Sequence, residues 1–262
     1  MPSLRALRSA GHDVVLVVTQ PDRPAGRGMK VTPPPVKVAA EELGLPVFQP
    51  ARIRDADAVE RLKSLAPDLL IVVAYGQIIP RSVLETPGLG AINVHASLLP
   101  RWRGAAPVAR AIMAGDDSTG VTIMKMDEKL DHGPLLGARP TPIGAEEDAA
   151  ALTARLADLG ADLLVEVLAQ LDRLRPAVQD DSKATVAAKL SKEEGELEWA
   201  MGATEIDRRV RGLQPWPGAT LPTSRGRVKI LRGHVEGDGY VLDVVQLPGK
   251  KPAPAKQVLA DA

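Results

Sequence analysis

The stretch INVHASLLPRWRGAAP, residues 92–107, leads from a strand through a loop rich in Pro, Arg and Gly into a helix. Side chains in a strand alternate between its two faces, so Asn93 and His95 point the same way. An amide and an imidazole side by side at the end of a buried strand can stabilise a developing oxyanion and move a proton. Asn93 and His95 are therefore candidate catalytic residues.

A second polar segment, MDEKLDHGP at residues 126–134, contains a carboxylate that could act on this histidine. An imidazole without neighbours has a pKa of about 6.5, so it needs a nearby carboxylate to stay cationic at neutral pH. Asp131 is the candidate for this role, either as an orienting group or as a relay for a proton. The neighbouring His132, like His12 and His234, has no such context, and we expect all three at the surface.

The composition excludes several kinds of site. The 262 residues allow one large or two medium domains, and because Lys plus Arg (33) equals Asp plus Glu (33), any basic surface must be local. The absence of cysteine excludes disulfides, thiolate nucleophiles and thiolate zinc sites. No cluster of residues has metal-ligand spacing, and no apolar run approaches the ~20 residues that span a membrane. Residues 1–10 carry two arginines and predict an amphipathic helix rather than a signal peptide. We expect a cytoplasmic protein without a metal.

The first two-thirds of the chain alternates strand and helix patterns. This alternation predicts an α/β fold with a Rossmann-like, mostly parallel sheet and a site at the carboxyl ends of its strands. The expected strands are residues 14–19, 68–76, 92–95 and 119–127, with 135–143 as a further strand or hairpin arm. The expected helices are residues 36–43, 55–66, 105–114 and 148–174.

The composition changes after Arg175, and this change predicts a second domain. Residues 176–190 lack a strong period and predict a linker. A short helix at 203–213 and apolar–polar alternation at 227–231 and 240–245 then predict a small β domain. We therefore divide the chain into domains at 1–175 and 191–262.

Five further motifs define a family resemblance. The chain resembles the methionyl-tRNA formyltransferases, in order and over nearly its whole length. The motifs, besides residues 92–107, are QPDRPAGRG (20–28), VVAYGQIIP (72–80), TGVTIMKMD (119–127), LSKEEGELEW (190–199) and QPWPGA (214–219). The resemblance implies a Rossmann-like catalytic domain, an OB-like tRNA-binding domain and a monomer. It also implies transfer of the formyl group of 10-formyltetrahydrofolate to the α-amine of methionyl-initiator tRNA, with Asn93, His95 and Asp131 as catalytic residues.

The resemblance also assigns two sets of binding residues. Those for folate are expected to form an apolar slot in which backbone N–H and C=O groups bind the flat heterocycle. They are Ala74, Tyr75, Gly76, Ser97, Leu98, Leu99 and Pro100. Those for tRNA are basic: Arg23, Arg27 and Lys30 in one loop, and Arg208, Arg209 and Arg211 at the start of a run to residue 232 that has seven basic residues and no acidic one. Arg27 is the residue expected to enter the acceptor stem. Without the resemblance, each set would be an ordinary turn or a solvated basic face.

The chain departs from the family pattern in three places. Members open with a strand and a Gly-Thr-Pro turn before the helix that here begins at Pro2, so the central first strand is missing and the start codon is expected to be misassigned. The C-terminal domain is short, so we expect an incomplete OB-like barrel. Lys129 and His132 stand where Gly and Thr are expected. Two alternatives stay open: a formyltransferase for a small amine such as a nucleotide sugar or glycinamide ribotide, and an inactive fragment.

Overall fold

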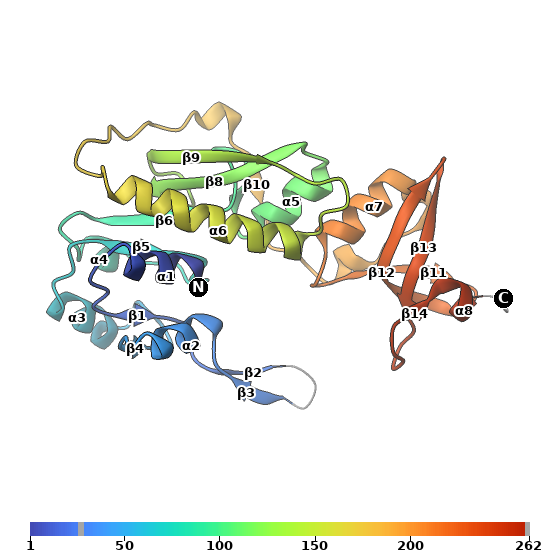
Figure 1. The fold of residues 1–262 in the computed structure, drawn as a ribbon, viewed down its shortest axis with the longest axis horizontal. Helices are drawn as coiled ribbons and strands as arrows, with labels where there is room; N and C mark the ends of the chain where they lie inside the picture. Colours follow the sequence, from blue (N-terminus) through green and yellow to red (C-terminus); the bar gives the residue numbers. More distant parts are fainter. Residues whose placement is uncertain (26–28, 260–262) are drawn as a thin grey trace. The chain divides into compact units, whose positions relative to one another are not determined.

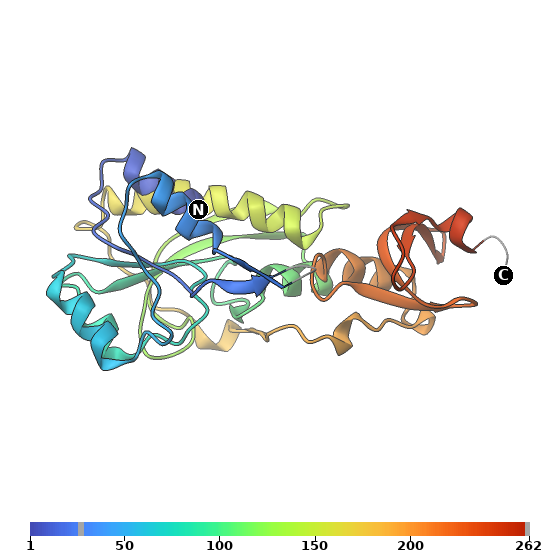
Figure 2. The same cartoon turned by 90° about the horizontal axis from the view of Figure 1, so that it is seen from below.

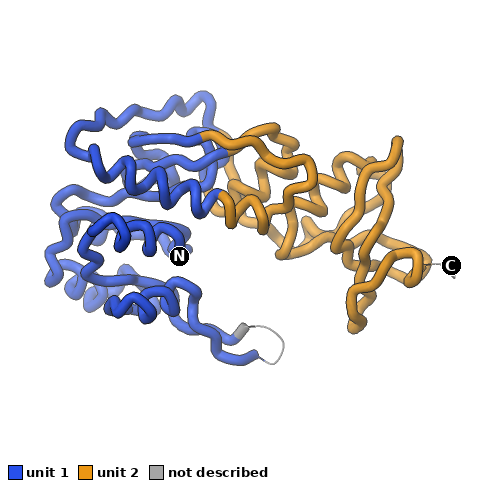
Figure 3. The backbone as a smooth tube through the Cα atoms, viewed as in Figure 1, with its two compact units in different colours: residues 1–103, 120–139, 156–184 blue, residues 104–119, 140–155, 185–262 orange. Residues whose placement is uncertain are grey.

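A computed structural model describes residues 1–25 and 29–259 of the chain. The chain forms two compact units that it enters more than once (Figure 3). Unit 1 comprises residues 1–103, 120–139 and 156–184, and unit 2 comprises residues 104–119, 140–155 and 185–262. The sequence-based domain boundaries at 175 and 191 stay a prediction. Among the described residues, no helix is long and apolar enough to cross a membrane.

The main sheet of unit 1 has the strand order β5-β6-β8-β9. Strand β5 (Leu70–Val72) runs parallel to β6 (Ala91–His95), as predicted. Strand β8 (Ser118–Lys125), predicted at 119–127, runs antiparallel to β6, so the sheet contains both parallel and antiparallel pairs. Strand β9 (Leu135–Pro142) follows at the edge. The predicted α/β class is confirmed. Strand β6 is hydrogen-bonded on both sides, to β5 through residues 91–93 and to β8 through residues 92–95.

Shorter strands complete the β structure of unit 1. Strands β1 (Val17–Val18) and β4 (Val47–Phe48) form a separate parallel pair, so the expected strand at 14–19 is shorter than its apolar run. Strands β2 (Arg23–Ala25) and β3 (Lys30–Thr32) pair antiparallel, on either side of residues 26–28. Arg23 and Lys30, two of the basic residues assigned to tRNA, therefore lie on a short β-ribbon.

Helices cover the strands of unit 1 on two sides. Helix α6 (Ala149–Leu168) lies over β6 and β8, and Figures 1 and 2 show α3 (Ala56–Ser64) on the opposite side of the strands. A Cβ on Gly160 of α6 would lie 2.9 Å from Val94 Cγ1 and 3.2 Å from Val121 Cγ1, so this glycine lets the helix pack directly on the sheet. The other helices of this unit are α1 (Pro2–Ser9), α2 (Pro35–Glu42), α4 (Arg81–Leu84) and the 3-10 helix η1 (Asp181–Lys183).

Unit 2 contains the predicted small β domain. Its sheet is antiparallel with the order β11-β12-β13-β14, and α7 (Ala203–Gly212) packs on it around buried Ile206, Leu221 and Ile230. Helix α7 also packs on α5 (Pro107–Ala114). The strands are β11 (Ala219–Thr223), β12 (Gly226–Glu236), β13 (Gly239–Gln246) and β14 (Ala253–Pro254). The remaining elements are the β7–β10 pair (Arg103–Gly104, Val186–Ala187), the 3-10 helices η2 (Glu193–Gly195) and η3 (Trp199–Met201), and α8 (Ala255–Leu259).

Candidate active site

Strand β6 carries Asn93 and His95, the two candidate catalytic residues of the 92–107 stretch, in its carboxyl-terminal half. Asn93 pairs with Val72 of β5 on one side and Met124 of β8 on the other, and His95 pairs with Thr122 of β8. The period of two predicted for this strand holds, because both side chains reach the same carboxylate. His95 is 5% exposed, so the protein shields its ring from bulk solvent.

Both ring nitrogens of His95 face defined partners. Nε2 lies 2.9 Å from the backbone carbonyl of Trp102, which can only accept, so Nε2 carries a hydrogen and donates it. Nδ1 lies 3.6 Å from Asp131 Oδ2, at ion-pair distance. With Nε2–H committed to the carbonyl, Nδ1 is the atom that gains or loses a proton. The ring can therefore pass a proton only on the side of Asp131.

Asp131 comes from the connection between β8 and β9. Its backbone φ is +47°, a left-handed conformation that costs a non-glycine residue energy, and Trp102 has φ +64°. The Asp131 carboxylate also accepts a 3.3 Å hydrogen bond from Asn93 Nδ2. One carboxylate thus orients the amide and the imidazole together. The expectation that Asp131 lies within reach of the His95 ring agrees with this geometry.

This arrangement leaves one N–H of the Asn93 amide available to a substrate. An amide nitrogen carries two hydrogens, and Asn93 uses one of them on Asp131. The second can donate to an oxyanion, while the carboxylate and the Nδ1 side of the imidazole can take up a proton. The prediction that His95 donates to the oxyanion is less favoured, because its Nε2–H points at Trp102.

The two segments assigned to folate follow adjacent parallel strands, so they leave the same edge of the sheet. Ala74 and Gly76 have φ values of +47° and +78°. The Tyr75 carbonyl accepts a hydrogen bond from Gln20, and burial of the phenol in an apolar cluster raises the pKa of Tyr75.

The second folate segment is tied to β8. The Ser97 hydroxyl is fully buried and donates to the Arg101 carbonyl, and the Ser97 carbonyl accepts from the Thr122 hydroxyl. Leu99 N donates to that same hydroxyl, and the Leu99–Pro100 peptide bond is cis. The Ser97 side chain supports the loop from inside, which leaves Leu98, half-buried, as the more accessible of the two leucines.

The basic residues assigned to tRNA differ in how many acidic partners they have. Arg23 is exposed and donates to Gln20, Lys30 is exposed on β3, and Arg27 lies outside the described residues. On α7, Arg209 pairs with Glu205, and Arg211 pairs with Asp207 and also donates to the Glu147 carbonyl. Part of the basic charge read from the sequence is therefore compensated within unit 2.

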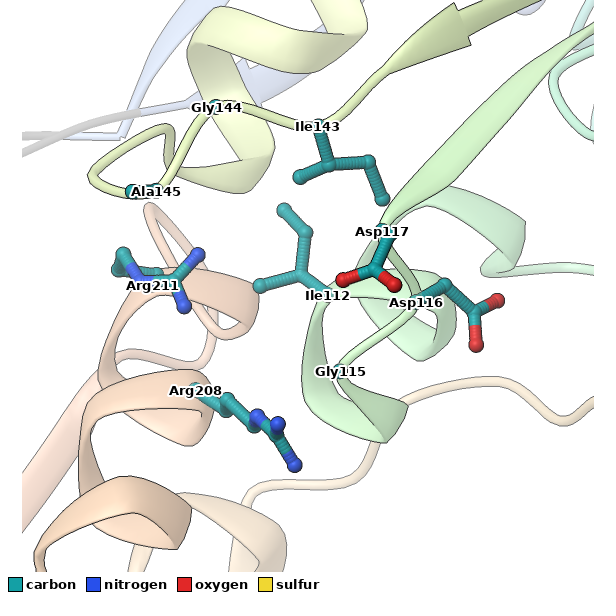
Figure 4. Close-up of a pocket in the computed structure, with 9 residues that line it drawn as sticks. All are labelled: Ile112, Gly115, Asp116, Asp117, Ile143, Gly144, Ala145, Arg208 and Arg211. Atoms are coloured by element: carbon teal, nitrogen blue, oxygen red, sulfur yellow. The ribbon is translucent and has the colours of Figure 1, made fainter.

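A pocket of about 160 Å³ in unit 2 places Arg208 and Arg211 near two carboxylates (Figure 4). Asp116 and Asp117 come from the segment after α5, and Ile112 of α5 forms the apolar wall. A Cβ on Gly115 would lie 2.2 Å from the Arg208 guanidinium carbon, so glycine gives this side chain its space. The pocket is mixed in charge rather than purely cationic.

Sequence reasoning missed the groups that surround the three candidates. The Trp102 carbonyl and the Gln179 amide carry no local pattern that would reveal them. His132 was expected at the surface, but it is half-buried, with Nδ1 2.8 Å from Asp127 and Nε2 3.4 Å from Asp181. The Arg103 guanidinium, which donates to Asp181, holds the pKa of that carboxyl below its ordinary value.

Comparisons with known proteins identify the family. Residues 2–168 match the family described as formyl transferase, and residues 189–241 match the formyl transferase C-terminal domain. The methionyl-tRNA formyltransferase of Methylococcus capsulatus is 54% identical over 221 residues, covering 84% of this chain and 72% of the relative. The methionyl-tRNA formyltransferase of Halorhodospira halophila is 54% identical over 233 residues, covering 88% of this chain and 75% of the relative.

A solved structure shares the fold. HypX from Aquifex aeolicus, crystallised in complex with tetrahydrofolic acid, superposes with a TM-score of 0.64 at 18% identity, covering 85% of this chain and 44% of HypX. HypX thus shares the fold, and the 54% identity of the two relatives agrees with the motifs of residues 20–28, 92–107 and 190–199. The chain belongs to the formyl transferase family, among the methionyl-tRNA formyltransferases.

Proposed function

We propose that this chain transfers the formyl group of 10-formyltetrahydrofolate to the α-amine of methionyl-initiator tRNA, giving formylmethionyl-tRNA for translation initiation in the cytoplasm. The observation that supports this most directly is the meeting of Asn93, His95 and Asp131 at the carboxyl end of β6 in a member of this family. The reaction uses no metal in this proposal.

The chemistry assigns a separate task to each of the three side chains. The neutral amine attacks the formyl carbon, a C–N bond forms, and the carbonyl oxygen becomes an oxyanion while the nitrogen becomes cationic. The second N–H of Asn93 donates to the oxyanion, and removing one such donor typically costs about 10²–10³ in rate. The amine's proton passes to the Asp131–His95 pair at Nδ1. Collapse breaks the bond to N10 of the folate, which takes a proton and leaves as tetrahydrofolate.

The substrates bind, in this proposal, on two sides of the reacting carbon. The pterin lies against backbone groups of Ala74, Tyr75 and Gly76 and the apolar turn at Leu98, Leu99 and Pro100. Two exposed cations of the β2–β3 ribbon, Arg23 and Lys30, contact phosphates of the acceptor stem together with Arg27. Residues 191–262 add a second tRNA contact, and the chain acts as a monomer.

A single assay tests both the reaction and the identity of the acceptor. The purified chain is incubated with 10-formyltetrahydrofolate and either charged initiator tRNA or a small amine such as a nucleotide sugar, and the formylated product is measured. We expect formylation of the tRNA, a loss of ten-fold or more in kcat/KM for tRNA in Arg27→Ala, and no change in Arg54→Ala, an exposed arginine chosen as the control.

The assay has two outcomes that would contradict the proposal. Formylation of the small amine with none of the tRNA would replace the acceptor by a small molecule. Equal rates for Arg27→Ala and Arg54→Ala on tRNA would remove the basic loop from the binding site and leave the chemistry of β6 in place.

A further inference from the structure

A buried glutamine outside the proposed catalytic residues links the two loops that hold His95 and Asp131. Gln179 is 7% exposed, and it lies in the irregular segment after Ala177 that the sequence predicts to be a linker. Two backbone hydrogen bonds, of 2.8 and 2.9 Å, pair Ala177 with Leu135 at the start of β9. This pairing fixes the position of Gln179 beside the β8–β9 connection.

The Gln179 amide uses its full hydrogen-bonding capacity. Nε2 donates to the carbonyl of Asp131 at 2.9 Å and to the carbonyl of Gly133 at 2.8 Å. Oε1 accepts from Arg103 Nε at 3.1 Å and from Arg103 Nη2 at 2.8 Å. A glutamine has two N–H donors and one oxygen with two lone pairs, so every one of them is used and the amide has a single orientation.

Each partner of this amide leads directly to a proposed catalytic residue. On the donor side, Gln179 holds the backbone of Asp131, which needs such support because its φ is +47°. On the acceptor side, Arg103 follows Trp102, whose carbonyl accepts from His95 Nε2. Arg103 is anchored further by a 2.7 Å hydrogen bond to Asp181. One side chain therefore sets the distance between the loops on either side of the imidazole.

We propose that Gln179 is a positioning residue, which keeps the Asp131 carboxylate and the Trp102 carbonyl in place on the two nitrogens of His95. This inference rests on the proposed function for its kinetic consequence, although the geometry that it predicts exists without substrate. A glutamate cannot replace this glutamine, because its carboxylate would still accept from Arg103 but would present oxygen to the carbonyls of Asp131 and Gly133.

The test compares Gln179→Glu with Gln170→Glu, the same chemical change at an exposed glutamine just after α6. Each variant is assayed for kcat and KM, and its melting temperature is recorded. In parallel, NMR of ¹⁵N-histidine-labelled protein follows the His95 ring nitrogens without substrate. The chain has four histidines, and His12 and His234 serve as internal references. Arg103→Lys is the second variant, in case Gln179→Glu does not fold. It keeps the positive charge but removes the guanidinium group whose two nitrogens donate to Gln179.

We expect Gln179→Glu to lower kcat by about 10- to 100-fold, because small displacements of catalytic groups have effects of this size, with KM for the folate within about three-fold. The His95 Nε2–H signal should shift or broaden, while those of His12 and His234 stay in place and Gln170→Glu matches wild type. A folded Gln179→Glu or Arg103→Lys variant with wild-type kcat and an unchanged His95 signal overturns the proposal. If the wild-type chain formylates no tRNA, the proposed function fails, and the NMR comparison alone decides whether Gln179 positions His95.

Discussion

The Asp131 carboxylate orients two different side chains, and this sets what each can contribute. It fixes one N–H of Asn93 and faces Nδ1 of His95, so the remaining Asn93 N–H is the donor available to an oxyanion. His95 Nε2 is committed to the Trp102 carbonyl. In the proposed reaction, the Asn93 amide is therefore the hydrogen-bond donor to the oxyanion, and the His95–Asp131 pair is the proton acceptor.

This division predicts the kinetics of two substitutions. Asn93→Ala and His95→Ala should each lower kcat by about 10² or more and leave folate affinity within a few-fold, because neither side chain forms the apolar slot. Steady-state formylation kinetics and folate titration measure the two quantities. His12→Ala is the control and should match wild type. A wild-type kcat in either variant would exclude that residue from the chemistry.

The sequence predicted Asn93 and His95 for a physical reason that does not extend to their surroundings. Strand periodicity is local, so residues two apart on β6 could be placed on one face without a structure. Gln179 acts through contacts with residues far away in the sequence, and the Trp102 carbonyl is placed by a left-handed backbone conformation, and neither feature leaves a periodic pattern. His132 was expected at the surface because one of its two partners, Asp181, is far along the chain, although the other, Asp127, is five residues away.

The β8–β9 connection that carries Asp131 depends on close backbone packing. Lys125 N donates to the Pro134 carbonyl at 2.9 Å, and a Cβ on Gly133 would lie 1.9 Å from the Lys125 carbonyl oxygen. Gly133→Ala should therefore force the connection apart and cost roughly 1–3 kcal/mol of stability. Thermal unfolding measures the loss. In Gly88→Ala, the control, the added Cβ has open space and stability should change little. Equal melting temperatures of the two variants would show that the connection tolerates the methyl group.

An ion pair within unit 2 fastens the segment after β10 to α5 and makes the stability of this unit depend on pH. Arg110 donates to both carboxylate oxygens of Glu194, and this hydrogen bond holds the pKa of Glu194 below its ordinary value of 4.5. Because the folded-state pKa is depressed, the contribution is fully present above pH 4.5 and is lost as the pH falls through the folded-state pKa.

Glu194→Gln should remove this pH dependence. At pH 7 it should unfold several degrees below wild type, since a hydrogen bond between charged groups contributes about 1.5–3 kcal/mol. The difference in melting temperature should shrink as the pH is lowered below 4.5. Thermal unfolding at a series of pH values gives both numbers, with Glu60→Gln at an exposed position as the control. A constant difference across this range would mean that the carboxylate does not titrate with folding.

The sequence predicted whether most segments are helices or strands, but it did not predict whether neighbouring strands run parallel or antiparallel. The 3.6-residue pattern predicted α2, α3, α5 and α7 to within a few residues, because a buried helix face must repeat. The apolar run of β8 shows that the strand is buried and carries no information on whether it runs parallel or antiparallel to β6. The direction is decided by the connection through α5, a property of the packed chain.

Charge compensation across the chain limits which cations can serve a polyanion. Net charge is zero, and in unit 2 the arginines 209, 211, 227 and 232 lie within ion-pair distance of acidic side chains. A cation that already neutralises a carboxylate releases few counterions when it meets a phosphate. In contrast, the exposed Arg23 donates to the neutral amide of Gln20. The basic count of the sequence thus overstates the charge available to tRNA.

Salt titration of tRNA binding tests this distinction. The logarithm of the association constant is measured against the logarithm of salt concentration between about 50 and 200 mM for wild type, Arg23→Ala and Arg211→Ala. Arg23→Ala should reduce the slope by about 1, the loss of one phosphate contact. Arg211→Ala should change it much less, because its guanidinium already serves Asp207 and the Glu147 carbonyl. Melting temperatures confirm that both variants are folded. A larger slope change for Arg211→Ala than for Arg23→Ala would mean that tRNA displaces the internal ion pairs, and α7 would then be the principal phosphate-binding element.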